Sequence, residues 1–596
     1  LAAGTINGGK TVTARSAKNG REKWTKPTLL TEIRDLFVAG GSVWVGGFKP
    51  FPSKRGPSWG PYFATQLNPA TGEVMMHIEP ENPSHHHRCY SNKATDRYIL
   101  AGRRGTEFID LVAGEVLWNS WARGACKYGV MPANGLVYTP PHPCACYVGA
   151  KLTGFHALAA KMDERRWTTE TTQERLEKGP AYKQIVNRNS QIVNPKEWPT
   201  YRNDAERSGY TPTPVPAVLR PRWQVKVGDK LTAPVVAAGK VFVATVDKHT
   251  VSAIDADSGK SAWRFTTGSR VDSPPTFYKG RAIFGSRDGH IYSVRASDGE
   301  LAWRLRAARE DRRIAAHGQI ESASPALGSV LVRDGVVCAT AGRSSYLDGG
   351  IDLYRIDPLT GKTLSETPIY SPDPETGRQP KQFAPSAMPG ARADILTADA
   401  HHVYLRDMVF STQGVNVGEG KPHLFTLTDF LDDSWTHRSF WIFGTKCSIS
   451  TGCSGRDRNL IFGRLIVFNE SNIYGYGRKQ VHWSNMLQDG PYRIFAMSRS
   501  GNAKQWEKAV PMQVRAMVLA DKVLFVAGLL ANEIDGPDGP DKSRGAALIA
   551  LSASDGAELG RRQLDSIPVF DGMASAYGRL YISMKDGSLL CLEKQQ

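Results

Sequence analysis

Long apolar runs, adjacent cysteines and a zinc-type cysteine pattern are all missing from this sequence. No apolar stretch approaches the roughly 18 to 20 residues that cross a bilayer, so we expect no transmembrane segment. The eight cysteines include no Cys-Cys pair and no paired C-x-x-C motif, and so match no standard structural zinc site. The sequence starts at Leu1 without a visible signal peptide. A chain that had already been processed or truncated would look the same.

Acidic residues are in deficit. Lys and Arg number 75 and Asp and Glu 58, a formal net charge of +17. This excess indicates either an anionic partner or a basic surface without a function. The basic residues are scattered and form no recognisable nucleic-acid-binding motif, so we expect no nucleic-acid partner. A chain of 596 residues is too long for one ordinary core and predicts two or more domains.

One strand-rich unit recurs along the chain. It is clearest in GKVFVATVDKHTVSAIDADSGKSAW (239–263) and GRAIFGSRDGHIYSVRASDGELAW (280–303). The closing Trp263 and Trp303 lie one repeat apart, and the glycine four residues before each suits the positive φ of a tight turn. A repeat of about 40 residues with alternating strands is typical of four-stranded β-propeller blades, with the Trp packed between neighbouring sheets.

The repeats predict an all-β chain with two propellers. Residues 198–596 are expected to form one complete propeller of seven blades, or eight, because the stretch 385–441 is irregular. Residues 219–228 have the pattern of an outer strand without a blade, and pairing them with the C-terminal blade closes the ring. Residues 1–160 predict about four blades of a second, incomplete propeller, completed by sequence or a chain not shown. Residues 161–197 read as a charged linker.

Several segments resemble a known family. WPTYRNDAERSGYTPTPVPAVLRPRWQVKVGDKLTAPVV resembles the entry to the propeller of bacterial PQQ-repeat-like (quinoprotein-type) proteins, large members of which carry a second, N-terminal propeller. HHRCYSNKATDRYIL, NGLVYTPPHPCACY, AGRSSYLDGGIDLY and GRLIVFNESNIYGYGR are similar to further segments of this group. The resemblance implies the fold and a periplasmic or secreted setting. It implies no activity, because such blades also serve as assembly scaffolds.

Quinone alcohol dehydrogenases share this repeat, and the resemblance therefore raises the question of PQQ as a cofactor. Those enzymes have a disulfide between adjacent cysteines above the cofactor and a calcium or lanthanide site of carboxylates and Asn. This sequence has no adjacent cysteines and no recognisable site of that kind. We therefore expect that the protein does not bind PQQ.

The densest group of polar residues lies between residues 85 and 147. A lyase acting on an acidic sugar needs a base to remove the proton next to the carboxylate, and a cation to stabilise the developing charge. On this hypothesis the catalytic candidates are His86, Arg88, Tyr90, Arg123 and Tyr128. The substrate-binding candidates beside them are Lys93, Arg97 and Asn134.

The same stretch supports two other interpretations. In one, a divalent metal (Zn, Cu or Ca) is bound by His85, His142, Cys144 and Cys146. In the other, disulfides suited to a secreted protein join Cys89 with Cys126 and, in a Gly/Ser loop further on, Cys447 with Cys453. Cys338 and Cys591 lie in apolar strands and are expected to be core thiols.

The C-terminal propeller adds its own candidates. Arg343, Tyr346 and Asp348 follow a strand, where blade loops reach the mouth of a ring, and are predicted to bind substrate; His317 and Glu321 are further candidates for the axis. Three functions remain open. The protein binds, and in the stronger form cleaves as a lyase or hydrolase, an anionic polysaccharide; or it is a non-catalytic binding or assembly scaffold; or it is a metal-dependent oxidoreductase.

Overall fold

The chain forms two compact units in the computed structural model. The structure describes residues 2–4, 11–30, 32–49, 62–79, 91–102, 105–125, 127–141, 149–152, 154–160, 171–183, 194–380, 388–426, 441–446, 461–480, 488–500, 503–530 and 545–595. Unit 1 comprises residues 1–165, 371–389 and 450–453, and unit 2 comprises residues 166–370, 390–449 and 454–596. Within the described residues, no helix is both long and apolar enough to cross a membrane.

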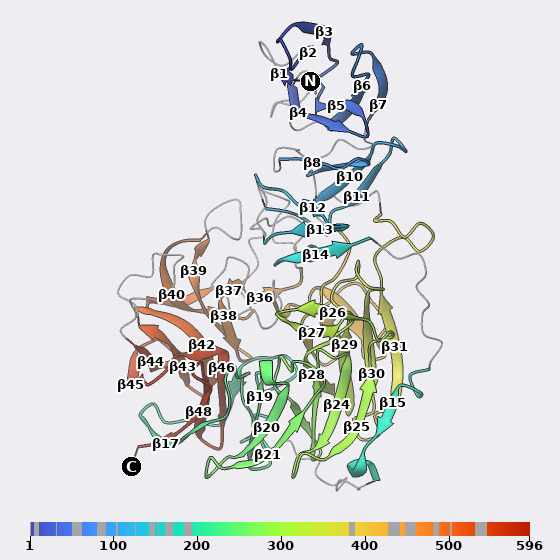
Figure 1. Ribbon diagram of the computed structural model, residues 1–596. Helices are drawn as coiled ribbons and strands as arrows, with labels where there is room; N and C mark the ends of the chain where they lie inside the picture. Colours follow the sequence, from blue (N-terminus) through green and yellow to red (C-terminus); the bar gives the residue numbers. More distant parts are fainter. Residues whose placement is uncertain are drawn as a thin grey trace. The chain divides into compact units, whose positions relative to one another are not determined.

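Unit 1 consists of antiparallel sheets of three or four strands (Figure 1). Its described sheets are β1 (Ala2–Gly4), β2 (Thr11–Arg15) and β3 (Glu22–Pro27); β4 (Glu32–Ala39), β5 (Ser42–Phe48), β6 (Tyr62–Leu67) and β7 (Val74–Ile78); β8 (Lys93–Ala94), β9 (Tyr98–Ala101), β10 (Thr106–Asp110) and β11 (Val116–Asn119); and β12 (Met131–Ala133), β13 (Leu136–Thr139) and β14 (His156–Ala159). The described residues of this unit thus hold four blade-like sheets.

Unit 2 begins with β15 (Leu176–Lys178), the 3-10 turn η2 (Pro180–Lys183), β16 (Tyr210–Thr211) and β17 (Leu219–Lys226). Its first four sheets contain β18 (Val235–Ala237), β19 (Lys240–Thr245), the 3-10 turn η3 (Val246–Lys248), β20 (Thr250–Asp255) and β21 (Ser261–Thr266); β22 (Thr276–Tyr278), β23 (Arg281–Gly285), β24 (His290–Arg295) and β25 (Leu301–Arg306); β28 (Ala326–Arg333), β29 (Val336–Ala341), β30 (Ile351–Ile356) and β31 (Thr363–Ile369); and β32 (Leu396–Ala398), β33 (His402–Leu405) and β34 (Met408–Ser411). A hairpin, β26 (Arg313–Ala316) and β27 (Gln319–Ser322), lies between the second and third sheets in sequence.

The remaining sheets of unit 2 complete its ring. They contain β35 (His423–Thr426), β36 (Trp441–Gly444) and β37 (Ile461–Gly463); β38 (Leu465–Phe468), β39 (Asn472–Gln480), β40 (Gln488–Ser498) and β41 (Lys504–Ala509); β42 (Met512–Ala520), β43 (Val523–Leu530), β44 (Ala546–Ser552) and β45 (Glu558–Leu564); and β46 (Pro568–Ala576), β47 (Arg579–Met584) and β48 (Ser588–Lys594). The described residues thus hold eight blades, the larger of the two counts expected. The all-β propeller fold is confirmed.

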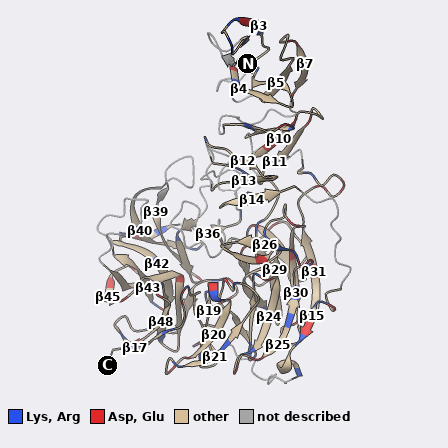
Figure 2. Cartoon of the chain, in the orientation of Figure 1, with Lys and Arg blue, Asp and Glu red and all other residues tan. Residues whose placement is uncertain are grey.

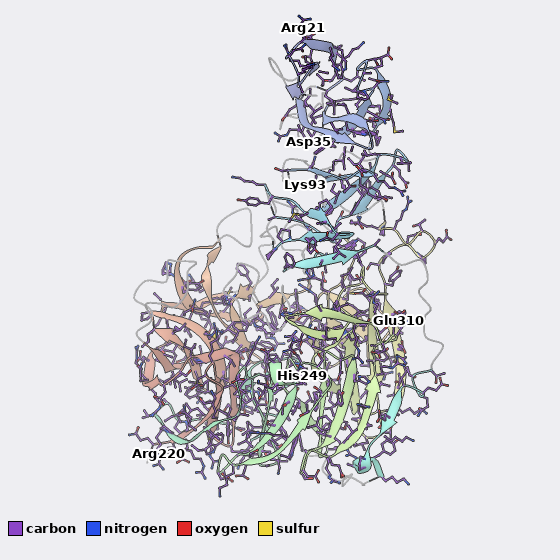
Figure 3. All side chains as sticks on the ribbon, in the orientation of Figure 1. Arg21, Asp35, Lys93, Arg220, His249 and Glu310 are labelled. Carbon is purple, nitrogen blue, oxygen red and sulfur yellow. The ribbon has the colours of Figure 1, made fainter. Side chains whose placement is uncertain are left out.

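The ring of unit 2 is closed. Neighbouring sheets contact one another in chain order, and the last sheet returns to the first through β46 and β18. β17 pairs antiparallel with β48, so strands from opposite ends of unit 2 share one sheet. Across this pair the Glu593 carboxylate accepts hydrogen bonds from Arg220 (3.0 Å) and Arg222 (2.7 Å); Figure 3 labels Arg220. β17 thus supplies the outer strand that the three strands β46–β48 lack.

The Trp of one repeat packs against the turn glycine of the next repeat. The indole of Trp263 packs on Gly299 of the next sheet, whose φ is +80°, and a Cβ on that glycine would lie 2.6 Å from the ring. The Trp263 Nε1 group also donates a hydrogen bond to the Ala296 carbonyl at 3.0 Å. The same indole-on-glycine packing recurs at Trp24 in unit 1 and at Trp223, Trp303 and Trp506 in unit 2. At these five junctions, neighbouring blades are therefore joined by the residues that mark the repeat.

Two segments do not follow a simple division of the chain into two units at residues 161–197. Residues 171–183 lie within the stretch expected to be a charged linker, yet β15 pairs with the outer strand β25 because Leu176 continues its apolar edge beside Leu305. Residues 371–380 follow β31 but belong to unit 1. There the buried Gln379 accepts a hydrogen bond from the Ser120 backbone N–H at 2.6 Å and donates one to its hydroxyl at 3.1 Å.

Candidate functional site

In unit 2, charged side chains gather on the loops at one end of the ring. In an antiparallel blade, the loop between the second and third strands lies at the same end as the loop leading to the next blade. We call this end the loop face; among its described segments are residues 246–249, 267–275, 286–289, 307–325 and 342–350. The β26–β27 hairpin is part of it and extends past the ends of β28–β30 (Figure 1). Elsewhere basic and acidic positions are interspersed along the chain (Figure 2).

The opposite end of the ring is occupied by residues 196–211, which we call the axial segment. Its backbone hydrogen-bonds to the last residues of the innermost strands: Trp198 with Val236, Pro199 with Phe277, Ala205 with Ala398, Ser208 with Phe468, Gly209 with Leu519 and Lys196 with Tyr577. These partners belong to six different blades. The axial segment therefore lies on the axis of the ring and closes that end.

Arg207 reaches a further blade from the axial segment. Its guanidinium donates to the Ser329 and Val330 carbonyls at 3.3 and 3.2 Å and to the Leu396 carbonyl at 3.2 Å. It also donates to Thr200 Oγ1 at 2.6 Å and to the Tyr201 carbonyl at 3.0 Å. Burial lowers the pKa of Arg207 to about 10, so the side chain is still charged at neutral pH.

Arg202 fills the axis above Arg207 and contacts the remaining blade. Its guanidinium donates to Asp571 Oδ2 at 2.7 Å and lies 4.8 Å from the ring centre of Trp441 on β36. The Tyr201 hydroxyl donates to the same Asp571 carboxylate. Both partners of the Arg202–Asp571 ion pair are buried. Since this part of the axis is filled by protein, a ligand reaches unit 2 from the loop face or the outside of the ring.

The loop face carries three arginines around one carboxylate, which we call the arginine cluster: Arg270, Arg287, Arg343 and Glu321. Arg270 Nε donates to Glu321 Oε1 at 2.7 Å, and Arg343 Nη2 donates to Glu321 Oε2 at 3.1 Å. Arg287 Nη1 lies 3.8 Å from the second oxygen, and its Nη2 is 2.6 Å from Asp272 Oδ2. The Glu321 side chain is fully buried. Three guanidinium groups against two carboxylates leave the group with a positive charge.

The β26–β27 hairpin is fixed over the cluster by side-chain contacts. His249 Nε2 is 2.7 Å from Gln319 Oε1, and Gln319 Nε2 donates to the Asp247 carbonyl at 3.2 Å. Ser269 Oγ donates to the Ile320 carbonyl at 3.0 Å. Figure 3 labels His249, on the loop between β19 and β20. The hairpin is thus held by the loops of the two preceding blades.

An exposed histidine lies at the tip of the hairpin. His317 has a φ of +51° in the turn between β26 and β27. Partial desolvation, followed by the charges of Arg270 and Arg287, lowers the pKa of His317 below its ordinary value. The imidazole is therefore largely neutral at pH 7, beside a group of cations. A neutral base next to arginines suits recognition of an acid and proton removal from it.

Arginines continue around the loop face beyond the cluster. Arg392 precedes β32, Arg406 joins β33 to β34, and Arg464 precedes β38; all three are buried. Arg515 on β42 donates to the Pro568 carbonyl at 2.9 Å. These side chains come from different blades, so the positive charge is distributed around the end of the ring and is not confined to one strand.

Several of the residues proposed from the sequence have described positions in unit 1. Lys93 Nζ donates to the Tyr128 carbonyl at 3.4 Å, which brings these two together, and the Tyr128 side chain is 76% exposed. Arg97 is engaged by Asp110 through two hydrogen bonds of 3.1 and 3.0 Å, which lower the pKa of Asp110 against its desolvation. Arg123 is buried.

Asn134 has a backbone role. With Gly135 it forms the turn between β12 and β13, and both have positive φ, +52° and +73°. This is the conformation that Asn-Gly favours in a two-residue hairpin. The other candidates of that stretch lie outside the described residues: His85, His86, Arg88, Cys89, Tyr90, Cys126, His142, Cys144 and Cys146. So do Cys447 and Cys453.

The cysteines that are described are thiols in strands. Cys338 and Cys591 are buried and unpaired, and burial raises the pKa of each thiol to about 12. Both therefore stay protonated in the core. In the described part of the chain no three His, Cys, Asp or Glu side chains are grouped as metal ligands.

The candidates in the C-terminal propeller lie on the loop face. Arg343 belongs to the arginine cluster, Asp348 accepts from Arg312, and Tyr346 is 8% exposed beside them. The sequence also indicated Glu321, but not its partners Arg270 and Arg287. Both follow strands and could have been found by listing charged residues at equivalent loop positions of successive repeats.

Comparisons with known proteins found a family model and solved structures that are similar to parts of this chain. A family model described as outer membrane protein assembly factor BamB matches residues 220–385. Among solved structures, quinohemoprotein alcohol dehydrogenase from Comamonas testosteroni is 14% identical, with a TM-score of 0.44 over 67% of this chain and 81% of that one. BamB from Moraxella catarrhalis is also 14% identical, with a TM-score of 0.38 over 64% and 99%. No curated protein matches the chain.

The closed ring of eight sheets, each of three to five strands, defines unit 2 as a β-propeller. The family-model match and the Gly/Trp-marked repeats specify its type. Unit 2 therefore has a PQQ-repeat-like β-propeller fold, and the family model covers residues 220–385 of the chain. This classification concerns the fold and the repeat, and a ligand or an activity does not follow from it.

Proposed function

We propose that this protein binds an acidic polysaccharide outside the cytoplasm, through the loop face of unit 2. The observation that carries the proposal is the arginine cluster, in which Arg270, Arg287 and Arg343 surround Glu321. Arginine binds carboxylates in a fork geometry, and polyuronates present one carboxylate on each sugar. The net charge of +17 also favours association with such a polymer.

Eliminative cleavage is the stronger form of this proposal. A lyase base takes up the proton next to the uronate carboxylate, and the electron pair of that C–H bond forms the new double bond. The bond to the leaving sugar oxygen breaks, and this oxygen takes up a proton from water. His317 supplies a neutral base at the tip of the hairpin, and the arginines supply charge for the carboxylate. Binding does not depend on this step.

An assembly scaffold is the second candidate. It is favoured by the match of residues 220–385 to a family model described as an outer membrane assembly factor. The four described sheets of unit 1 fit the same role, since we propose that further blades, from sequence or a chain not shown, complete that propeller. A scaffold binds a protein partner and has no affinity for uronate polymers.

Binding of the full chain to polygalacturonate, with neutral dextran as the comparison, tests the proposal by titration calorimetry. We expect binding of the acidic polymer only, weakened about tenfold or more in Arg343→Ala, because a charge-assisted hydrogen bond contributes about 1.5–3 kcal/mol. Arg561→Ala is the matched control, since Arg561 forms an exposed ion pair with Glu558 on the outer strand β45. Equal affinities of Arg343→Ala and Arg561→Ala would refute the site.

Cleavage is read in the same samples. New unsaturated ends increase the ultraviolet absorbance as the polymer is cut. A rise that is lost in His317→Ala supports the lyase form, and a flat absorbance with tight binding restricts the function to binding. Absence of binding to any uronic-acid polymer contradicts the proposal and favours the scaffold.

A further inference from the structure

The arginine cluster already holds a carboxylate that belongs to the chain. Glu321 lies at the end of β27, and its two oxygens face different arginines: Arg270 on Oε1 and Arg343 on Oε2. Arg343 also donates to the Ser322 carbonyl at 3.3 Å. A carboxylate enclosed by guanidinium groups in this way has the coordination that a bound uronate would have.

We propose that the arginine cluster is a carboxylate-binding site which the free protein occupies with Glu321, and that a uronate carboxylate replaces Glu321 when the β26–β27 hairpin moves. The hairpin is then an internal competitor of the ligand. This inference rests on the proposed function and names the group of the polymer that is recognised.

Exchange of one carboxylate for another keeps the ion pairs of the cluster. A buried arginine left without a partner is strongly destabilising, so Glu321 does not leave an empty site behind. An incoming uronate supplies the same charge and the same acceptor oxygens. The net cost of exchange is therefore set mainly by the contacts that hold the hairpin, not by the cluster.

Those contacts are few and polar. A two-stranded hairpin is marginally stable on its own. Of its apolar residues, Ile320 is 58% exposed; the buried residues of β27 are the polar Glu321 and Ser322. Besides Glu321, the hairpin is held by Gln319 on His249 and on the Asp247 carbonyl, and by the Ser269 hydroxyl on the Ile320 carbonyl. The Ser322 N–H donates to the Arg287 carbonyl at 2.8 Å, and Arg312 beside the hairpin donates to Asp348.

The variant Glu321→Gln tests this exchange in the full chain. It keeps the shape of the side chain but removes the competing charge. We expect a galacturonate trisaccharide to bind at least tenfold more tightly to Glu321→Gln than to the unaltered protein in calorimetry at low ionic strength. The neutral galactose trisaccharide should bind neither protein. The gain should disappear in Glu321→Gln combined with Arg343→Ala.

A second variant leaves the cluster intact. The double change His249→Ala with Gln319→Ala loosens the hairpin and keeps Glu321 and all three arginines. It should also bind the trisaccharide more tightly, and it decides the outcome where Glu321→Gln does not fold, as judged by its melting temperature. Arg561→Ala, remote from the loop face, should leave the affinity unchanged.

The results separate the two proposals. Trisaccharide affinities that are equal in the unaltered protein, Glu321→Gln and the hairpin variant overturn the competitor role and leave the proposed function standing. Tighter binding in both variants supports the exchange. No binding of trisaccharide or polygalacturonate by any of the proteins overturns both.

Discussion

Replacement of Arg207 by alanine is expected to destabilise unit 2 more than the loss of any exposed arginine. Arg207 makes five hydrogen bonds from the axial segment: three to the innermost strands β28 and β32 of two blades, and two within its own segment. Alanine at this position leaves the Tyr201, Ser329, Val330 and Leu396 carbonyls without that donor. These acceptors lie on the axis, where water has limited access.

The magnitude follows from the four carbonyls. A buried acceptor that loses its partner costs about 1–3 kcal/mol, and relaxation and entering water reduce the sum. Releasing the buried charge offsets part of the loss, because desolvation already opposes ionisation of Arg207. We expect a net decrease of about 3–5 kcal/mol in the free energy of unfolding of unit 2. Arg207→Lys, which keeps the charge but not the fork of donors, should lose about half of this.

Urea unfolding followed by tryptophan fluorescence measures the loss, and hydrogen exchange locates it. The amides of β28 and β32 should lose protection together with those of β42 and β46, because the axial segment contacts all of these blades. The exposed pair Arg561–Glu558 provides a control, at less than about 0.5 kcal/mol for Arg561→Ala. A midpoint for Arg207→Ala within error of that control would show that the axial segment does not join the blades.

Three further changes test other parts of the fold. Burial raises the pKa of Asp394 to about 6, so its protonated carboxyl contributes stability below about pH 4, and this contribution is lost as the pH rises through 6. Asp394→Asn should therefore flatten the pH profile of the free energy of unfolding by about 3 kcal/mol between pH 4 and pH 6. Gly299→Ala should lower the free energy of unfolding by about 2–4 kcal/mol in a thermal unfolding assay, because its Cβ would lie 2.6 Å from the Trp263 ring. Gly239→Ala is the control: its φ is similar but its Cβ would meet open space, so the loss should be about 1–2 kcal/mol. Gln379→Ala should expose the amides around β11 of unit 1 to faster hydrogen exchange without altering β42, since its partner is Ser120; unchanged exchange at β11 would contradict the assignment of residues 371–380 to unit 1.

The blades were predictable because their signal is local. Strand alternation, the turn glycine and the Trp recur within about 40 residues, and each contact between Trp263 and Gly299 joins one repeat to the next. A blade can therefore be recognised from one repeat alone. The count of eight was harder, because the sheet of β35, β36 and β37 has long intervening segments and lacks the repeated Gly and Trp.

The contacts of the axial segment could not be predicted from local sequence patterns. Its sequence was recognised only by resemblance, as an entry to the propeller, since it contains no period and almost no strand. The partners of Arg207 in other blades are main-chain carbonyls 122 to 189 residues away, and any residue type would offer the same carbonyl. Nothing in the sequence at Ser329 or Leu396 marks them as acceptors. The role of Arg207 follows only once the ring has brought the innermost strands to one axis.

The arginine cluster was predicted only in part from the sequence. Arg343 and Glu321 were found as polar residues near strand ends, but Arg270 and Arg287 were not, because a single basic residue in a polar loop has no distinguishing pattern. What makes them a site is the geometry of a propeller, which returns the chain to the same end of the ring at each blade. Residues 270, 287, 321 and 343 occupy successive returns to the loop face, so their charges accumulate even though they are well separated in sequence. In a repeat protein of this type, charged residues therefore carry more information when they are compared by their position within the repeat than when they are compared with their neighbours in sequence.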